Sequence, residues 1–274
     1  MKDRALHPYH MVPVSPWPFV VASGLAGFVG GLVAYFSGST PDLLIMSLVG
    51  LVVSFFLWVR DMVREATFLG MYVRLVRKQL RMGFFLFLIS EIMLFVSCFW
   101  AFFHSGLTPT PWVGCDWPPV GVKVPDFKML PGCGTGLLLT SGASVTWAHK
   151  ALQSGKRKSA LVGIGVTIFL GLSFTGMQLY EYFVLPFTIS DSVFGSCFFL
   201  LTGLHGLHVI AGSAGLILSW GRCYFKHFSP GRHLGFQAAM WYWHFVDVMW
   251  VGVYLAAYVW GGLGVTWGQG HILW

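Results

Sequence analysis

Apolar runs long enough to cross a membrane recur along the chain, separated by short polar or basic segments. The clearest run, residues 83–103, carries one charge, Glu91, near its middle. At 1.5 Å per residue a helix of this length is about 31 Å long, which matches the hydrocarbon core of a bilayer. We therefore expect an all-α membrane protein, a bundle of seven transmembrane helices in a single integral membrane domain of residues 1–274. The expected spans are residues 17–36, 43–66, 80–104, 134–152, 159–184, 192–220 and 234–260.

The composition agrees with a chain that is surrounded by lipid. It is 56% hydrophobic and 10% charged, with a mean hydropathy of +0.71. A soluble domain carries about 25% charged residues, so the class of soluble proteins is excluded. The first fifteen residues hold two prolines and three charges and lack the apolar core of a cleavable signal. The net charge of +7 does not indicate a nucleic-acid partner, because the basic residues lie between the apolar runs.

The basic residues also predict the orientation. If the N-terminus is inside and there are seven spans, 15 of the 17 Lys and Arg residues fall in inside segments, Lys2 and Arg4 among them. Lys123 and Lys128 fall outside. Positive charge is retained on the inside of membranes, so this asymmetry favours an inside N-terminus.

Two of the expected spans carry packing signals. Residues 17–36 include Gly27 and Gly31, whose G-x-x-x-G spacing lets two helices approach closely in lipid. Residues 134–152 are the least apolar run and contain several Ser and Thr residues. We expect neighbouring helices to enclose that run and to hydrogen-bond with it. Residues 105–133 are rich in Pro and Gly and are expected to form the longest loop.

Glu91 is costly at mid-membrane depth, so it must be protonated, paired or turned toward protein. One interpretation is a carboxylate that handles protons. The other is a protonated acid that hydrogen-bonds a neighbouring helix and has a structural role. We favour the structural interpretation, because a single acid in its span makes a poor relay.

Several other polar residues lie within the later spans. His205 and His208 form one i, i+3 pair, and His244 and Asp247 form another, so each pair is expected on one helix face. His149 lies in the fourth span, and Gln178 and Glu181 lie near the outer end of the fifth.

Each pair has a chemical and a structural interpretation. His205 and His208 are candidate ligands of a metal or haem, but the further ligands are missing, so we favour hydrogen bonding across helices. His244 is either oriented by Asp247 or forms an internal neutralising pair with it, and we favour the neutralising pair.

Two further features leave alternatives open. None of the five cysteines forms a C-x-x-C pair, which argues against a cysteine-based metal site. Cys115 and Cys133 share one loop and form a disulfide only if that loop faces an oxidising space. Residues 60–81 hold six basic residues. With Trp58, Arg60 and Arg64 they suit an anionic phospholipid, although positive-inside topology alone also explains the charge.

Long motifs then identify a family resemblance. They include WVRDMVREATFLG (58–70), LRMGFFLFLISEIMLFVSCFWAFFHSGLTPT (80–110), SGASVTWAHKAL (141–152), PFTISDSVFGSCFFLLTGLHGLHVIAGS (186–213) and GFQAAMWYWHFVDVMWVGVYLAAYVWG (235–261). In this order they resemble subunit 3 of the haem–copper cytochrome c oxidases, in its mitochondrial form. With the other matching segments they cover nearly all of the chain.

The resemblance implies a non-redox core subunit of respiratory complex IV, in the mitochondrial inner membrane. It implies seven transmembrane helices, with helices 1 and 2 separated from helices 3 to 7 by a lipid-filled cleft. Haem a and copper belong to partner subunits. The chain is expected to pack against the catalytic subunit 1 and to support assembly, stability and proton uptake during electron transfer from cytochrome c to dioxygen.

The resemblance also assigns roles to single residues. Glu91 matches the family's buried, carbodiimide-reactive carboxylate. Tyr72 departs from the family, which commonly carries at this position a histidine that helps to hold a lipid head group. Tyr72 is nevertheless counted among the residues expected to bind phospholipid. The others, which match the family's lipid-cleft region, are Trp58, Arg60, Arg64, Glu65 and Arg222.

Two other functions are weighed against this one. A stand-alone proton-coupled transporter would use Glu91 and Asp247, but transporters of that class favour internal repeats and broken helices, and the chain shows no repeat. The third function is that of a haem-bearing catalytic subunit, but the chain lacks the histidine ligands that a haem would need.

Overall fold

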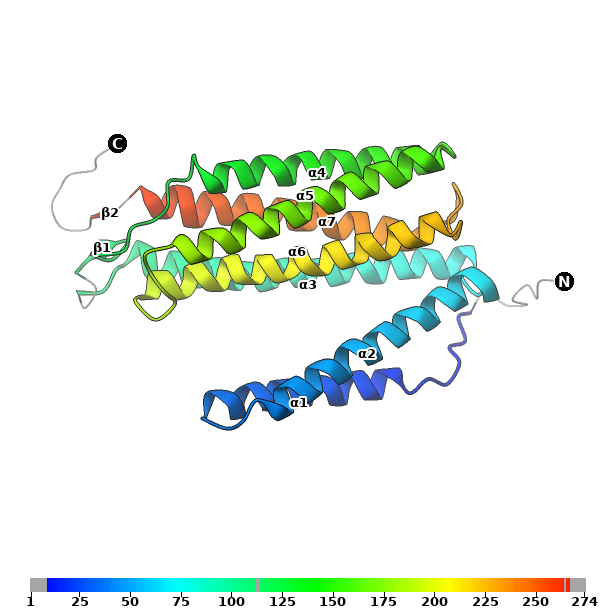
Figure 1. Cartoon of the computed structure of the whole chain (residues 1–274), viewed down its shortest axis with the longest axis horizontal. Helices are drawn as coiled ribbons and strands as arrows, with labels where there is room; N and C mark the ends of the chain where they lie inside the picture. Colours follow the sequence, from blue (N-terminus) through cyan, green and yellow to red (C-terminus); the bar gives the residue numbers. More distant parts are fainter. Residues whose placement is uncertain (1–8, 112–113, 264, 267–274) are drawn as a thin grey trace. The chain divides into compact units, whose positions relative to one another are not determined.

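The computed structural model describes residues 9–111, 114–263 and 265–266 and shows a predominantly helical chain (Figure 1). Lys2 and Arg4, which the charge count includes, lie outside these residues. The long helices of the described chain are α1 (Trp17–Phe36), α2 (Asp42–Arg64), α3 (Arg74–Leu107), α4 (Leu130–Gln153), α5 (Arg157–Val184), α6 (Val193–Tyr224) and α7 (Leu234–Val253). Two π-helical segments, η1 (Glu65–Leu69) and η3 (Tyr254–Trp260), continue α2 and α7. The all-α fold class is confirmed, whereas the lipid-filled cleft and the inside N-terminus stay predictions.

Within the described residues, five helices are long and apolar enough to cross a membrane. They are α1, α2 with η1, α3, α5 and α6. The other two expected spans, α4 and α7, are not among them, because Ser and Thr in α4 and Trp, Tyr, His and Asp in α7 lower the mean hydropathy. That these two helices also cross the membrane stays a prediction.

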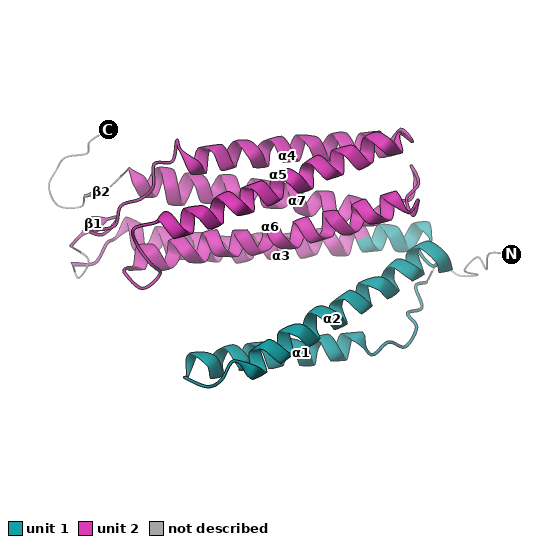
Figure 2. Cartoon of the chain, in the orientation of Figure 1, with its two compact units in different colours: residues 1–80 teal, residues 81–274 magenta. Residues whose placement is uncertain are grey.

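The chain forms two compact units, residues 1–80 and 81–274 (Figure 2). In the first unit, Gly31 of α1 contacts the backbone of α2 so closely that an added Cβ would lie 2.8 Å from the Cα of Leu44. A Cβ at Gly27 would lie 3.2 Å from the Cβ of Ser47. These contacts confirm that the glycine spacing brings two helices together.

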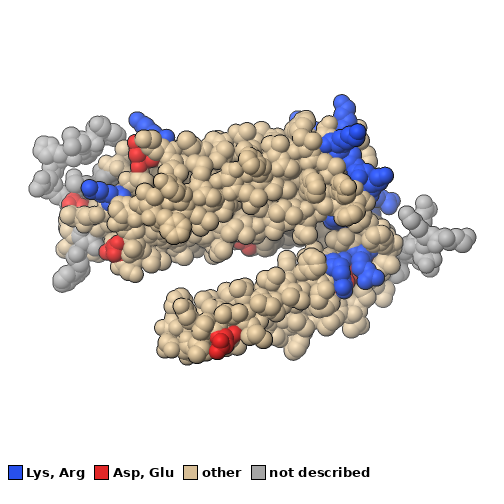
Figure 3. All heavy atoms as spheres, in the orientation of Figure 1, with Lys and Arg blue, Asp and Glu red and all other residues tan. Residues whose placement is uncertain are grey.

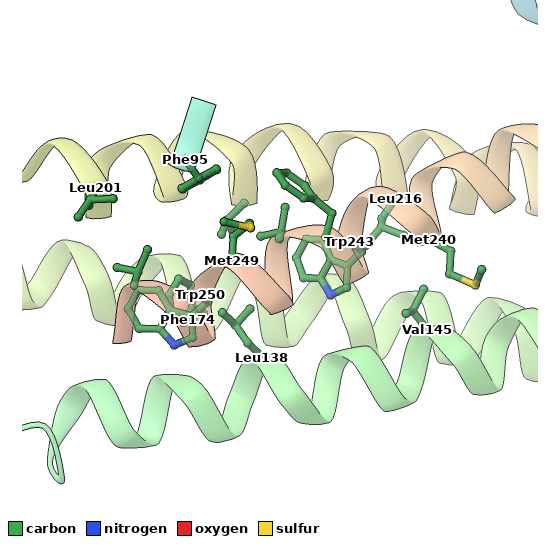
Figure 4. Close-up of a cluster of buried hydrophobic side chains, with 14 of the residues drawn as sticks. Phe95, Leu138, Val145, Phe174, Leu201, Leu216, Met240, Trp243, Met249 and Trp250 are labelled. Carbon is green, nitrogen blue, oxygen red and sulfur yellow. The ribbon is translucent and has the colours of Figure 1, made fainter. Parts of the chain in front are cut away.

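In the second unit, α7 carries two of the buried tryptophans of a helical core. Trp243 and Trp250 are almost fully buried. Figure 4 shows them in one cluster with residues of α4, α5 and α6, among them Leu138, Val145, Phe174, Leu201 and Leu216. Glycines make room for the indole of Trp243, because a Cβ at Gly171 of α5 would collide with its ring.

A short pair of strands was not predicted. β1 (Asp116–Trp117) pairs antiparallel with β2 (Val265–Thr266), with Asp116 opposite Thr266. Residues 105–133 were expected as a loop, and two-residue strands leave no periodic pattern in a sequence. The pairing fixes the chain around Trp117, whose buried ring lies 5.5 Å from the ring of Phe102 and 5.3 Å from that of Phe194.

Basic side chains of the second unit gather at the end of its bundle where α4 ends and α5 begins (Figure 3). The residues at this end include Lys150, Lys156, Arg157 and Lys158. Lys123 and Lys128 lie in the segment before α4, at the opposite end. The distribution agrees with the predicted charge asymmetry for this unit.

The glycine beside Trp243 provides a test of the core. We expect Gly171→Ala to destabilise the protein by about 1–3 kcal/mol, because the added methyl group must displace a fully buried indole. Gly176 is the matched control on the same helix, since nothing lies within 4 Å of a Cβ added there. Gly176→Ala should preserve or raise stability, because alanine favours helix by about 1 kcal/mol over glycine. The measurement is the Tm of the protein in mild detergent, and equal Tm values for the two variants would contradict the packing.

Candidate functional site: buried polar pairs between helices

Glu91 of α3 is paired with His208 of α6. Glu91 Oε2 lies 2.9 Å from His208 Nε2, and the two side chains are 22% and 8% exposed. His208 Nδ1 lies 2.7 Å from the carbonyl oxygen of Leu204, so Nδ1–H donates within α6 and Nε2 is left for Glu91. The rings of Phe95 and Tyr242 flank the imidazole, with their centres 5.1 and 6.1 Å from the centre of the imidazole ring. One proton therefore serves both groups, either as an ion pair or as a carboxylic acid that donates to a neutral imidazole.

His205 and His208 both pack against aromatic rings of α7, but they hydrogen-bond to different helices. His205 Nε2 lies 3.2 Å from the carbonyl oxygen of Val246 on α7, whereas His208 contacts α3. Residues three apart on a helix differ by about 60° around its axis, enough to face two different neighbours. The contacts agree with hydrogen bonding across helices.

His244 and Asp247 lie at the contact between α4 and α7. His244 Nε2 is 3.1 Å from Thr146 Oγ1, whereas its Nδ1 is 3.9 Å from Asp247 Oδ2, too far for a hydrogen bond. The histidine is therefore oriented by α4 and not by its own carboxylate. Gly142 of α4 makes room for Asp247, because a Cβ there would lie 2.6 Å from Oδ2.

Asp247 has fewer hydrogen-bond partners than Glu91. It is 7% exposed, and its Oδ1 has no hydrogen-bond partner among the described residues. With His244 it lines a groove of about 580 Å³. The other lining side chains are mostly apolar and include Leu139, Trp147, Val248 and Val251. The acid and the imidazole can each hold a proton there.

A third polar cluster was not predicted. Gln178 Nε2 of α5 donates to the hydroxyl of Tyr258 at 3.2 Å, and Tyr182 donates to Thr202 of α6 at 2.6 Å. Glu181 lies beside them, 5% exposed. The sequence placed Gln178 and Glu181 near one end of a span, but no spacing linked them to Tyr258, which lies in the π-helical segment η3.

Five of the residues expected to bind phospholipid lie in the first unit. They are Trp58, Arg60, Arg64, Glu65 and Tyr72. Arg60 is paired with Asp61, with Nη2 and Oδ1 3.0 Å apart, and Asp61 also accepts a hydrogen bond from the Trp17 indole at 2.6 Å. The charge of Arg60, an exposed residue, is thus partly neutralised by the neighbouring carboxylate.

The other members of this set have different surroundings. Glu65 Oε2 lies 3.9 Å from His10 Nε2. The ring of His10 contacts the ring of Tyr72 edge-on, with 5.4 Å between the ring centres. Arg64 is exposed. Arg222 belongs to the second unit, where its guanidinium lies 4.6 Å from the centre of the Phe228 ring.

All five cysteines are free thiols in the structure, and a disulfide between Cys115 and Cys133 in an oxidising space stays a prediction. Cys133 lies within the first turns of α4, and Cys115 lies just before β1.

Comparisons with known proteins agree on one family. A family model described as Cytochrome c oxidase subunit III matches residues 7–262. A protein of Branchiostoma lanceolatum named Cytochrome c oxidase subunit 3 is 49% identical over 255 residues, 93% of this chain and 97% of that protein. Proteins of the same name from Papio hamadryas and Anopheles gambiae are 47% and 46% identical, over 93% and 95% of this chain and 98% and 100% of their own lengths.

The pairing of Glu91 with His208 can be measured by a double-mutant cycle. Glu91→Ala, His208→Ala and the double variant should show a coupling of about 0.5–3 kcal/mol in the free energy of unfolding in mixed micelles. Glu91→Ala with His205→Ala is the control, because His205 contacts Val246 instead. The control pair should be additive. A coupling as large in the control pair would contradict a specific contact.

Proposed function

Because the chain belongs to the cytochrome c oxidase subunit III family, we propose that it acts in the oxidase as a non-redox core subunit beside the catalytic subunit 1. Its place is the mitochondrial inner membrane, and haem a and copper belong to partner subunits. There it supports assembly, stability and proton uptake while electrons pass from cytochrome c to dioxygen and protons are pumped. The observation that carries the proposal is the family match over residues 7–262, nearly the full length of the relatives.

The contacts of the polar residues support a packing role for this subunit. His205, His208 and His244 each contact a polar group of a neighbouring helix. In lipid no water replaces such a partner, so these bonds hold the helices in register. We infer that the paired histidines and Glu91 keep this helix bundle rigid where it packs against the catalytic subunit. They do not themselves transfer electrons.

Bound phospholipid is part of the same proposal. Arg64 is exposed and Trp58 is half-buried in the first unit. A guanidinium and an indole at head-group depth suit an anionic phospholipid, which accepts hydrogen bonds at its phosphate. We assign Arg64 as the stronger contact, because Arg60 is already engaged by Asp61.

Co-purification tests the proposal directly. Native membranes are extracted with a gentle detergent, and whatever accompanies the chain is examined by optical spectroscopy and mass spectrometry. We expect haem a absorption and the catalytic subunits. Stripping the chain away should leave all the haem with those subunits. A chain that purifies alone and colourless would overturn the proposal and favour the transporter that uses Glu91 and Asp247.

Glu91→Gln tests the structural role of the carboxylate. Glutamine keeps the shape and a polar contact with His208 but removes the charge. We expect normal assembly, turnover and number of protons pumped per electron, measured in proteoliposomes. Glu91→Leu, which removes the hydrogen bond and leaves His208 without its partner, should lower the yield of assembled oxidase. Full assembly of Glu91→Gln with a selective loss of pumping would contradict the structural role.

A further inference from the structure

Two histidines meet at the basic end of the second unit, apart from the polar pairs described above. His149 lies near the end of α4, and His233 directly precedes α7. Their Nε2 atoms are 3.1 Å apart, and their ring planes are inclined by 66°. Gln153 lies one turn after His149, and its amide nitrogen is 3.3 Å from His149 Nε2. Three side chains from two elements therefore converge on one point.

The hydrogen bond of His233 fixes which of its nitrogens is free. His233 Nδ1 lies 3.1 Å from the carbonyl oxygen of Ser229, so Nδ1–H donates there and the lone pair is on Nε2. Histidines that bind metals have this arrangement, with the second ring nitrogen donating to a carbonyl. His233 is only 9% exposed, whereas His149 is partly exposed and leaves a path for an ion.

The distance between the two nitrogens suits a metal ion. Two Zn–N bonds of 2.0–2.1 Å at a tetrahedral angle hold their nitrogens about 3.3 Å apart, so the observed separation requires only a small ring movement. The described residues contain no group of three His, Cys, Asp or Glu around one point. The remaining ligands are therefore the amide oxygen of Gln153, after rotation of the amide, and water.

We propose that His149 and His233 form an exchangeable site for a divalent transition-metal ion such as Zn²⁺, with Gln153 as the third protein ligand. Without the ion, the ring proton of His149 lies on Nε2 and points at His233 Nε2. When the ion binds between the two Nε2 atoms, His149 carries this proton on Nδ1 instead. Imidazole suits Zn²⁺, Cu²⁺ and Ni²⁺. The exposed cations Lys150 and Arg232, next in sequence to the two histidines, weaken binding, so the ion is an effector and not a resident cofactor.

Such an ion would join α4 to α7 beside the groove that contains Asp247. Thr146, which contacts His244, lies three residues before His149 on α4. The bridge thus restrains the same helix contact from its basic end. The site does not depend on the role proposed for the whole chain, because its test measures the histidines themselves.

Carbethoxylation of histidines tests the site in the intact protein, purified in mild detergent with the subunits that accompany it. Diethyl pyrocarbonate is added with and without ZnCl₂, and modification is measured for each histidine by mass spectrometry. We expect Zn²⁺ to lower the modification of His149 several-fold. His233→Ala should abolish this protection, although His149 is still present, and Gln153→Ala should weaken it. His104, an exposed histidine on α3, is the control and should react equally with and without the ion.

Two outcomes would overturn the site. One is equal modification of His149 with and without Zn²⁺ in the unaltered protein, which would reduce the pair to a hydrogen bond. The other is protection of His149 that persists in His233→Ala, which would place the ion elsewhere. If His233→Ala fails to assemble, His149→Ala asks the same question through the protection of His233, and His104→Ala controls for the loss of a histidine.

Discussion

The hydrocarbon core of a bilayer offers no hydrogen bond to a polar group, and this constraint determines how the helices of the second unit pair. α4 is rich in Ser and Thr, and its hydroxyls bond to α5 and α7. Trp243 donates to Ser141 at 2.8 Å, Trp250 donates to Thr135 at 3.0 Å, and Ser144 lies 2.7 Å from Thr167. The helices with the most polar atoms thus satisfy one another, and the more apolar helices are left to face lipid.

These bonds require helices that approach closely, and small residues provide the approach. A Cβ at Gly163 of α5 would lie 2.8 Å from the Cβ of Ala148 on α4. Gly171 and Gly212 lie against the indole of Trp243, which fills the space they leave. Small residues on three helices and large aromatic residues on α7 are therefore parts of one packing solution, in which an indole both fills volume and donates a hydrogen bond.

The class of contact was predictable from single residues, but the partner was not. A carboxylate at the depth of Glu91 needs a partner on energetic grounds alone, yet His208 is 117 residues away and no spacing links the two. The enclosure of α4 followed from its Ser and Thr content. The i, i+3 rule placed His205 and His208 on one face, but which neighbour each faces depends on how α3 and α7 pack around α6. β1 and β2 are too short to leave a pattern.

The surroundings of Glu91 and Asp247 argue for different roles. Glu91 is satisfied, and a proton shared with His208 has no onward route through that imidazole, because Nδ1 already donates to the carbonyl of Leu204. That closed arrangement suits a structural contact better than a relay, which needs a second acceptor in line. Asp247 has the opposite character: one oxygen lacks a partner among the described residues, and the carboxyl lines a groove. A buried acid in that position either stays neutral or is completed by a donor that enters the groove. Of Glu91 and Asp247, Asp247 is therefore the one whose hydrogen bonding the described residues leave incomplete.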